Sequence, residues 1–102
     1  MSREFTNYQT LAQAKIRNKR LFEEKRNAVK ARRSANEELM NTFVGTAADT
    51  YKARSDEMLR KIDELEAKAD AKLDKDLGFW RNQLDETELK SAREFDEKIG
   101  LV

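Results

Sequence analysis

The chain has 102 residues, with no proline, cysteine or histidine and only three glycines. A chain of this length has room for one domain, and so few turn residues argue against a sheet of several strands. The missing histidine and cysteine are the commonest general base and the commonest metal ligands, so we expect no enzyme activity, cofactor or metal. The net charge of +1 gives no strong attraction to nucleic acid, although 40% of the residues are charged.

The apolar runs are short. None exceeds three residues, whereas a membrane-spanning helix needs roughly 20, so we expect no membrane insertion. The first residues also lack the apolar stretch of a secretory signal peptide, so any export would use a route that does not read such a signal.

The first predicted element is a helix over about residues 7–41. Thr6 and Gln9 have the spacing of a capping box, which marks a helix start. Apolar residues then follow at spacings of three, four and seven, as on one stripe of a helix. They are Tyr8, Leu11, Ala14, Leu21, Phe22, Ala28, Val29, Ala35 and Leu39. Polar Asn18, Lys25 and Arg32 fall in the same stripe, so the seam is imperfect.

A turn is predicted over residues 42–46. Gly45 suits a helix end, and Thr46 with Asp49 forms a second capping box that starts a helix over about 47–83. Its apolar stripe is Ala48, Tyr51, Met58, Ile62, Leu65, Ala69, Leu73, Leu77, Trp80 and Leu84. One continuous helical rod that tolerates Gly45 is the alternative. We favour an all-α, antiparallel two-helix hairpin over residues 1–102.

Charge favours the antiparallel arrangement. Residues 1–41 hold ten basic and five acidic residues, whereas residues 46–102 hold eleven and fifteen, so the two predicted helices have opposite net charge. With the turn near residue 44, position n faces about 88 − n. Because one helix pair buries little surface, we expect a dimer that forms a four-helix bundle.

That register leaves a helical extension, residues 84–102, without a partner in the hairpin. It must fold back, remain mobile or bind another protein. We interpret the apolar stripe around it as a candidate partner interface, made of Leu77, Trp80, Leu84, Leu89, Ala92, Phe95 and Ile99. The pair Phe79–Trp80 either packs against Tyr8 in the core or anchors a partner.

The turn segment, residues 43–51, resembles the signature of the WXG family, the small helical-hairpin substrates of bacterial type VII secretion. Gly45, Ala47, Ala48 and Tyr51 match it position for position, and Phe43 stands where the family usually has tryptophan. Any tight helical hairpin could use the same residues for packing alone. The family's export signal, an aromatic residue followed four positions later by an acid, is missing, since residues 83, 84 and 99 are not acidic.

The resemblance implies a non-enzymatic, protein-binding protein that is secreted without a signal peptide. Its implied partners are the type VII secretion machinery and a second helical protein. The assembly would be a homodimer, or a heteromer with a related helical protein or with the helical N-terminal domain of a toxin. The alternative is a cytoplasmic coiled-coil adaptor with no role in secretion. Nucleic-acid binding by the basic run from Lys15 to Arg33 is a weaker option, because Glu23 and Glu24 interrupt that run.

Overall fold

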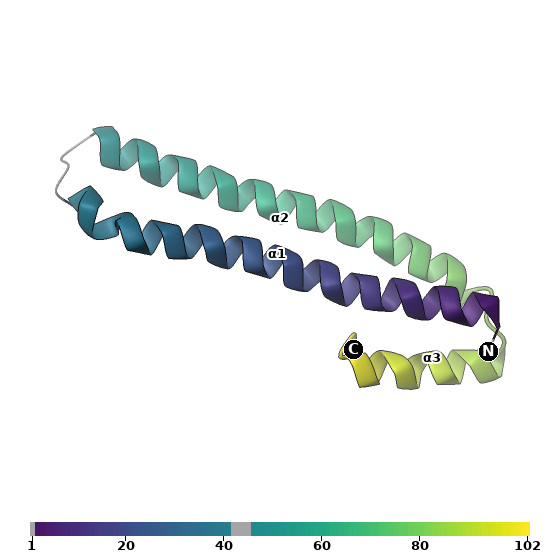
Figure 1. Cartoon of the computed structure of the whole chain (residues 1–102). Helices are drawn as coiled ribbons and strands as arrows, with labels where there is room; N and C mark the ends of the chain where they lie inside the picture. Colours follow the sequence, from purple (N-terminus) through teal and green to yellow (C-terminus); the bar gives the residue numbers. More distant parts are fainter. Residues whose placement is uncertain (1, 42–45) are drawn as a thin grey trace. The chain divides into compact units, whose positions relative to one another are not determined.

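The computed structural model describes residues 2–41 and 46–102. These residues form three α-helices, α1 (Arg3–Asn41), α2 (Thr46–Arg81) and α3 (Glu86–Ile99), and they contain no strand (Figure 1). The prediction of an all-α protein is therefore confirmed. The predicted turn residues Phe43, Val44 and Gly45 lie outside the described residues.

Helix α1 begins one turn earlier than the capping box at Thr6 predicts. Ser2 is the N-terminal cap, because its Oγ accepts a hydrogen bond of 3.0 Å from the backbone N–H of Phe5. Thr6 lies inside the helix, where its hydroxyl donates to the carbonyl oxygen of Ser2 at 3.1 Å. The predicted start at Thr6 is wrong because Ser2 can cap a helix as well as Thr6 can. The earlier start also brings Phe5 into the core.

The C-terminal segment is a separate helix and not an extension of α2. Helix α2 ends at Arg81, and α3 starts with a capping box in which Asp85 Oδ1 accepts from the N–H of Glu88 at 2.8 Å. Gly100 ends α3 in the left-handed conformation, with φ of 79°. The predicted continuous extension is therefore wrong. The break between Arg81 and Glu86 contains neither glycine nor proline, so the sequence gives little sign of it. Only the capping-box spacing of Asp85 and Glu88 marks the new helix start.

The described chain divides into two compact units. Unit 1 comprises Met1–Arg20 and Ala67–Val102, and unit 2 comprises Leu21–Glu66. Unit 1 therefore takes one end of α1, one end of α2 and the whole of α3. Unit 2 takes the remaining parts of α1 and α2.

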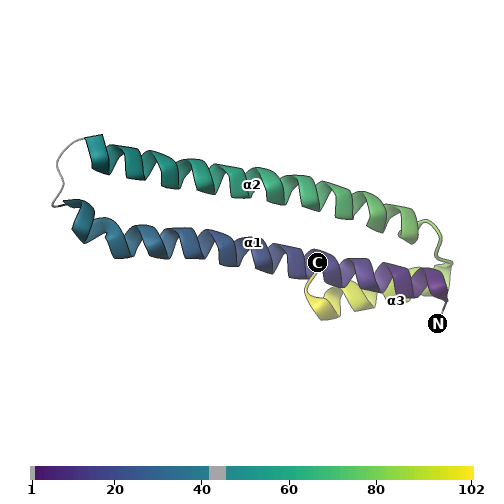
Figure 2. The same cartoon turned by 45° about the horizontal axis from the view of Figure 1, so that its top comes forward.

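Unit 1 holds an apolar core to which all three helices contribute. Its buried members are Phe5, Tyr8, Ala12, Leu77, Leu84 and Ala92. Helix α3 lies beside the first turns of α1 in both views (Figures 1 and 2). Of the three possible fates of residues 84–102, the structure therefore shows the first: the segment folds back onto its own chain.

Few of the described residues of unit 2 are buried. Among its described residues only Phe22 and Ser55 are buried, at 8% and 6% exposure. Ion pairs connect its two helical segments: Arg33 lies 2.8 Å from Asp56, and Arg26 lies 2.8 Å from Glu66 and 3.1 Å from Asp63. These ion pairs connect the α1 and α2 segments within unit 2.

Replacing Leu77 with alanine should destabilise the protein by about 2–5 kcal/mol, because it leaves a cavity in the core of unit 1. Leu77 is 4% exposed, whereas Leu65 on the same helix is 56% exposed. Leu65→Ala is therefore the matched control, with an expected loss below about 0.5 kcal/mol. Urea unfolding followed by circular dichroism measures both, and equal losses would contradict this assignment of the core.

Candidate functional site

The described residues contain no group of three acidic, histidine or cysteine side chains placed to hold a metal ion. The acidic stretch of α2 with Asp70, Asp74 and Asp76 is accordingly not such a group. Asp74 pairs with Lys15 of α1 within unit 1, and Asp70 and Asp76 are half-buried. None of the helices described is both long enough and apolar enough to cross a membrane.

The turn motif is only partly described. Phe43 and Gly45 lie outside the described residues, Ala47 belongs to the first turn of α2, and Ala48 is half-buried. Tyr51 is the best defined of the five. Its hydroxyl accepts a hydrogen bond of 3.1 Å from Asn36 Nδ2, so the aromatic residue of the motif contacts α1.

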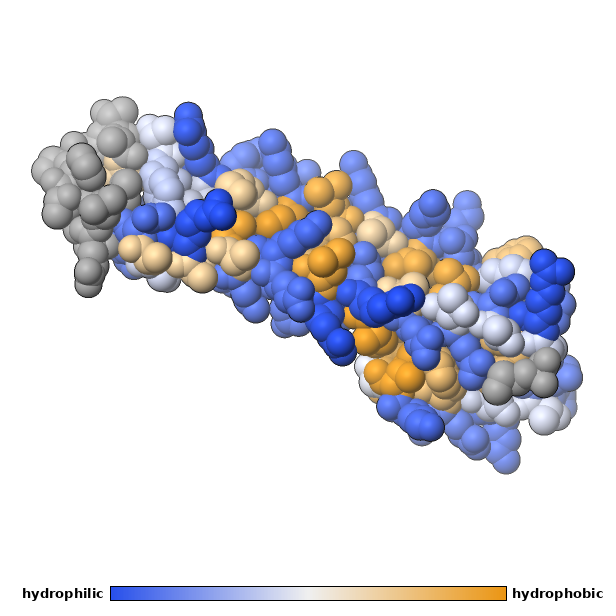
Figure 3. All heavy atoms as spheres, in the orientation of Figure 1, coloured by the Kyte–Doolittle hydropathy of each residue, from blue (hydrophilic) through white to orange (hydrophobic). Residues whose placement is uncertain are grey.

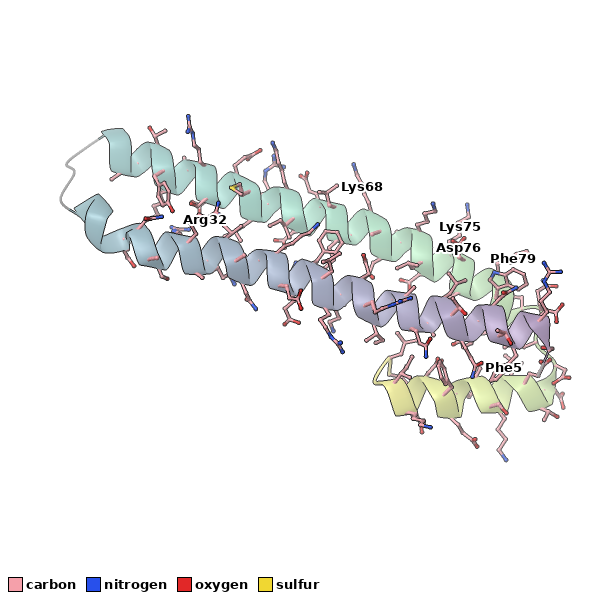
Figure 4. The ribbon with its side chains drawn as sticks, in the orientation of Figure 1. Phe5, Arg32, Lys68, Lys75, Asp76 and Phe79 are labelled. Carbon is pink, nitrogen blue, oxygen red and sulfur yellow. The ribbon has the colours of Figure 1, made fainter. Side chains whose placement is uncertain are left out.

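The residues predicted as a partner interface lie together, but in the core of unit 1. Leu77, Leu84 and Ala92 are buried there, and Trp80, Leu89, Phe95 and Ile99 pack against them partly buried. The chain itself therefore covers the surface that the sequence pattern offers to a partner. Of the two roles considered for Trp80, core packing or anchoring a partner, the structure shows packing against the core. Its neighbour Phe79 is 57% exposed, with its ring 5.2 Å from that of Trp80 (Phe79 is labelled in Figure 4).

A buried polar cluster in unit 1 was not predicted. Tyr8 is fully buried, and its hydroxyl donates a hydrogen bond of 2.5 Å to Asp96 Oδ2. Arg81 Nη2 donates to the same hydroxyl at 3.0 Å and lies 4.0 Å from Asp96 Oδ2, so the cluster joins all three helices. Burial, and then the hydrogen bond to Asp96, raise the pKa of Tyr8. No sequence signal pairs residues this distant, since Tyr8 reads as one more member of an apolar stripe.

Near this cluster, Ser2 donates to the Glu88 carboxylate, which ties the start of α1 to α3. Phe5 lies on the side of α1 that faces α3 (labelled in Figure 4). The cluster and these contacts connect α1, α2 and α3 within unit 1. We assign them a structural role.

An exposed apolar surface lies on unit 2. A groove of about 320 Å³ runs between its helices and is lined by Ala28, Val29 and Arg32 from α1 and by Tyr51, Arg54, Ser55 and Met58 from α2. Met58 is 47% exposed. Space-filling representation shows apolar side chains gathered over these helices (Figure 3).

This surface continues along both helices. Leu21 is seven residues from Ala28 and Leu65 is seven from Met58, so each pair lies on one face of its helix. Leu21 and Leu65 are 48% and 56% exposed. We call Leu21, Ala28, Val29, Tyr51, Met58 and Leu65 the groove face.

The basic run of α1 is partly neutralised within the chain. Lys15, Arg26 and Arg33 each pair with an acidic residue of α2, which fits a solvated face with interhelical ion pairs better than a nucleic-acid interface. Arg32 and Arg54, which line the groove, make no ion pair with any described carboxylate.

Comparisons with known proteins give no match: no family model fits the chain, and neither the curated proteins nor the solved structures contain a similar one. The function of this chain is therefore inferred from its own residues and their geometry.

Tyr8→Phe should destabilise the protein by about 1–3 kcal/mol, because the buried Asp96 loses its hydrogen-bond donor. The effect should depend on pH. Folding raises the pKa of Tyr8, so as pH rises the tyrosine of the unfolded chain ionises before that of the folded chain, at about pH 10. Stabilisation by the hydroxyl is complete below that pH and is lost as pH rises through the folded-state pKa.

Urea unfolding of wild type and Tyr8→Phe between pH 8 and pH 11.5 measures this difference. The gap in unfolding free energy between the two proteins should shrink at the alkaline end. A gap that stays constant or widens would show that the hydroxyl is not held as described.

Proposed function

We propose that this chain is a non-enzymatic, protein-binding protein and that the groove face is where its partner docks. The observation that supports this most directly is the exposure of Met58, Leu65 and Leu21 on a unit with only two buried residues among those described. Apolar side chains on a contiguous face are typical of interaction surfaces. This proposal moves the partner interface from the stripe around Trp80 to unit 2.

The proposed assembly is a four-helix bundle. In it, residues 21–66 form a two-helix hairpin and the partner contributes further helices over the groove face. A single seam between two helices buries too little apolar surface for a stable fold, so a second layer would add what unit 2 lacks. The partner would be a second copy or a related helical protein.

We further propose that the binding serves type VII secretion in bacteria. Gly45, Ala47, Ala48 and Tyr51, with Phe43 in the tryptophan position, support this through their resemblance to the WXG signature. The chain would then be a substrate, or the targeting partner of a toxin whose helical N-terminal domain it binds. Because it lacks the aromatic–acid export signal, it would leave the cell on the signal of that partner. The alternative is a cytoplasmic coiled-coil adaptor that uses the same groove face.

The secretion proposal predicts that the chain appears in the culture medium only when the type VII secretion ATPase is functional. The measurement is immunoblotting of medium and cell pellet from wild-type cells and from cells lacking the ATPase. A known substrate of the same system serves as the positive control, and a cytoplasmic protein reports lysis. If the control substrate is exported while this chain stays in the pellet, the adaptor alternative replaces the secretion proposal.

A further inference from the structure

We infer that the groove face binds an amphipathic helix whose apolar stripe is flanked by acidic residues. The inference rests on the proposed protein-binding function and adds the chemistry of the partner. It is carried by two observations on unit 2: the shape of the groove and the charge of its rim.

The shape of the groove suits a helix. Its lining includes two short side chains from α1, Ala28 and Val29, and the longer Tyr51 and Met58 from α2. An inserted helix places apolar side chains every three or four residues along such a floor. Leu21 and Leu65 extend the apolar surface by two helical turns, so the occupant can make contacts over several turns.

The rim of the groove is positively charged. Arg32 and Arg54 line it from opposite helices (Arg32 is labelled in Figure 4), and neither pairs with a described carboxylate. Asp56, which is two residues from Arg54, pairs with Arg33 instead. Carboxylates flanking the stripe of an incoming helix would supply the missing partners, whereas a basic helix would be repelled.

A second copy of the chain fits this surface less well. If two groove faces met, the arginines of one would approach those of the other. The acidic residues beside Met58 and Leu65 are Glu57 and Glu64, and Arg60 of the same helix already pairs with both. A different chain that brings unpaired carboxylates is therefore the better complement.

The test measures peptide affinity by fluorescence anisotropy. The probe is a synthetic helix of three heptads with leucine at the seam positions and glutamate on both flanks, and its counterpart has lysine on the flanks. Wild type should bind the acidic probe and discriminate against the basic one. Arg32→Glu/Arg54→Glu should weaken binding of the acidic probe at least about tenfold and strengthen binding of the basic one.

A matched control separates the local rim from the total charge. Lys30→Glu/Lys52→Glu makes the same change in net charge on the same two helices, and both lysines lie outside the groove lining. Affinity of this control for the acidic probe should stay within about twofold of wild type. Circular dichroism of every variant establishes that its helices are intact. Equal weakening by both double variants would overturn the inference, because attraction would then follow net charge alone.

A variant of the apolar floor distinguishes failure of the inference from failure of the function. Met58→Gln should weaken binding of the acidic probe, because it removes an apolar contact from the groove. If Met58→Gln weakens binding but both probes bind wild type equally, a protein-binding groove stands and the acidic partner is rejected. If wild type binds neither probe but sediments as a dimer that Met58→Gln dissociates, the occupant is a second copy and the inference is wrong. Binding to phosphatidylglycerol vesicles in preference to the acidic probe would likewise overturn it.

Discussion

The hydrogen bond between Tyr8 and Asp96 is the constraint on which unit 1 depends. A buried carboxylate is costly unless donors reach it, and here Asp96 Oδ2 accepts from a fully buried tyrosine on another helix, whereas its Oδ1 has no hydrogen-bond partner among the described residues. The pair fixes α3 in one position over α1, so that Leu84 and Ala92 enter the same core as Phe5. Apolar packing supplies most of the stabilisation, but it would accept several orientations of α3, whereas the polar contact selects one.

Unit 2 is organised differently, and this difference is the reason for assigning binding to it. Its register is set by ion pairs at the helix edges, which are weak individually because they are exposed. They align the two helical segments without covering the apolar residues between them. Among the described residues, unit 1 thus holds most of the buried apolar side chains, while Leu21, Met58 and Leu65 of unit 2 remain exposed.

Periodicity and composition predict an all-helical chain, because the apolar spacing extends over the whole length of a helix. They do not predict the helix ends: Ser2 and Thr6 are both good caps, and only burial of Phe5 decides between them. They also miss the return of α3, since an apolar stripe looks the same whether its own chain or a partner covers it. The polar cluster depends on two residues 88 positions apart, for which local patterns carry no signal.

The return of α3 has a consequence for how the protein is made. Contacts in unit 2 join residues such as Arg26 and Asp63, 37 positions apart, whereas unit 1 closes only when Asp96 reaches Tyr8. On the ribosome, the first helix therefore emerges long before its cover is synthesised, and Phe5 and Tyr8 stay accessible to chaperones or to neighbouring nascent chains throughout that interval. A ribosome that stalls before α3 would release a chain with this surface open, and such fragments should be preferred substrates for quality-control proteases.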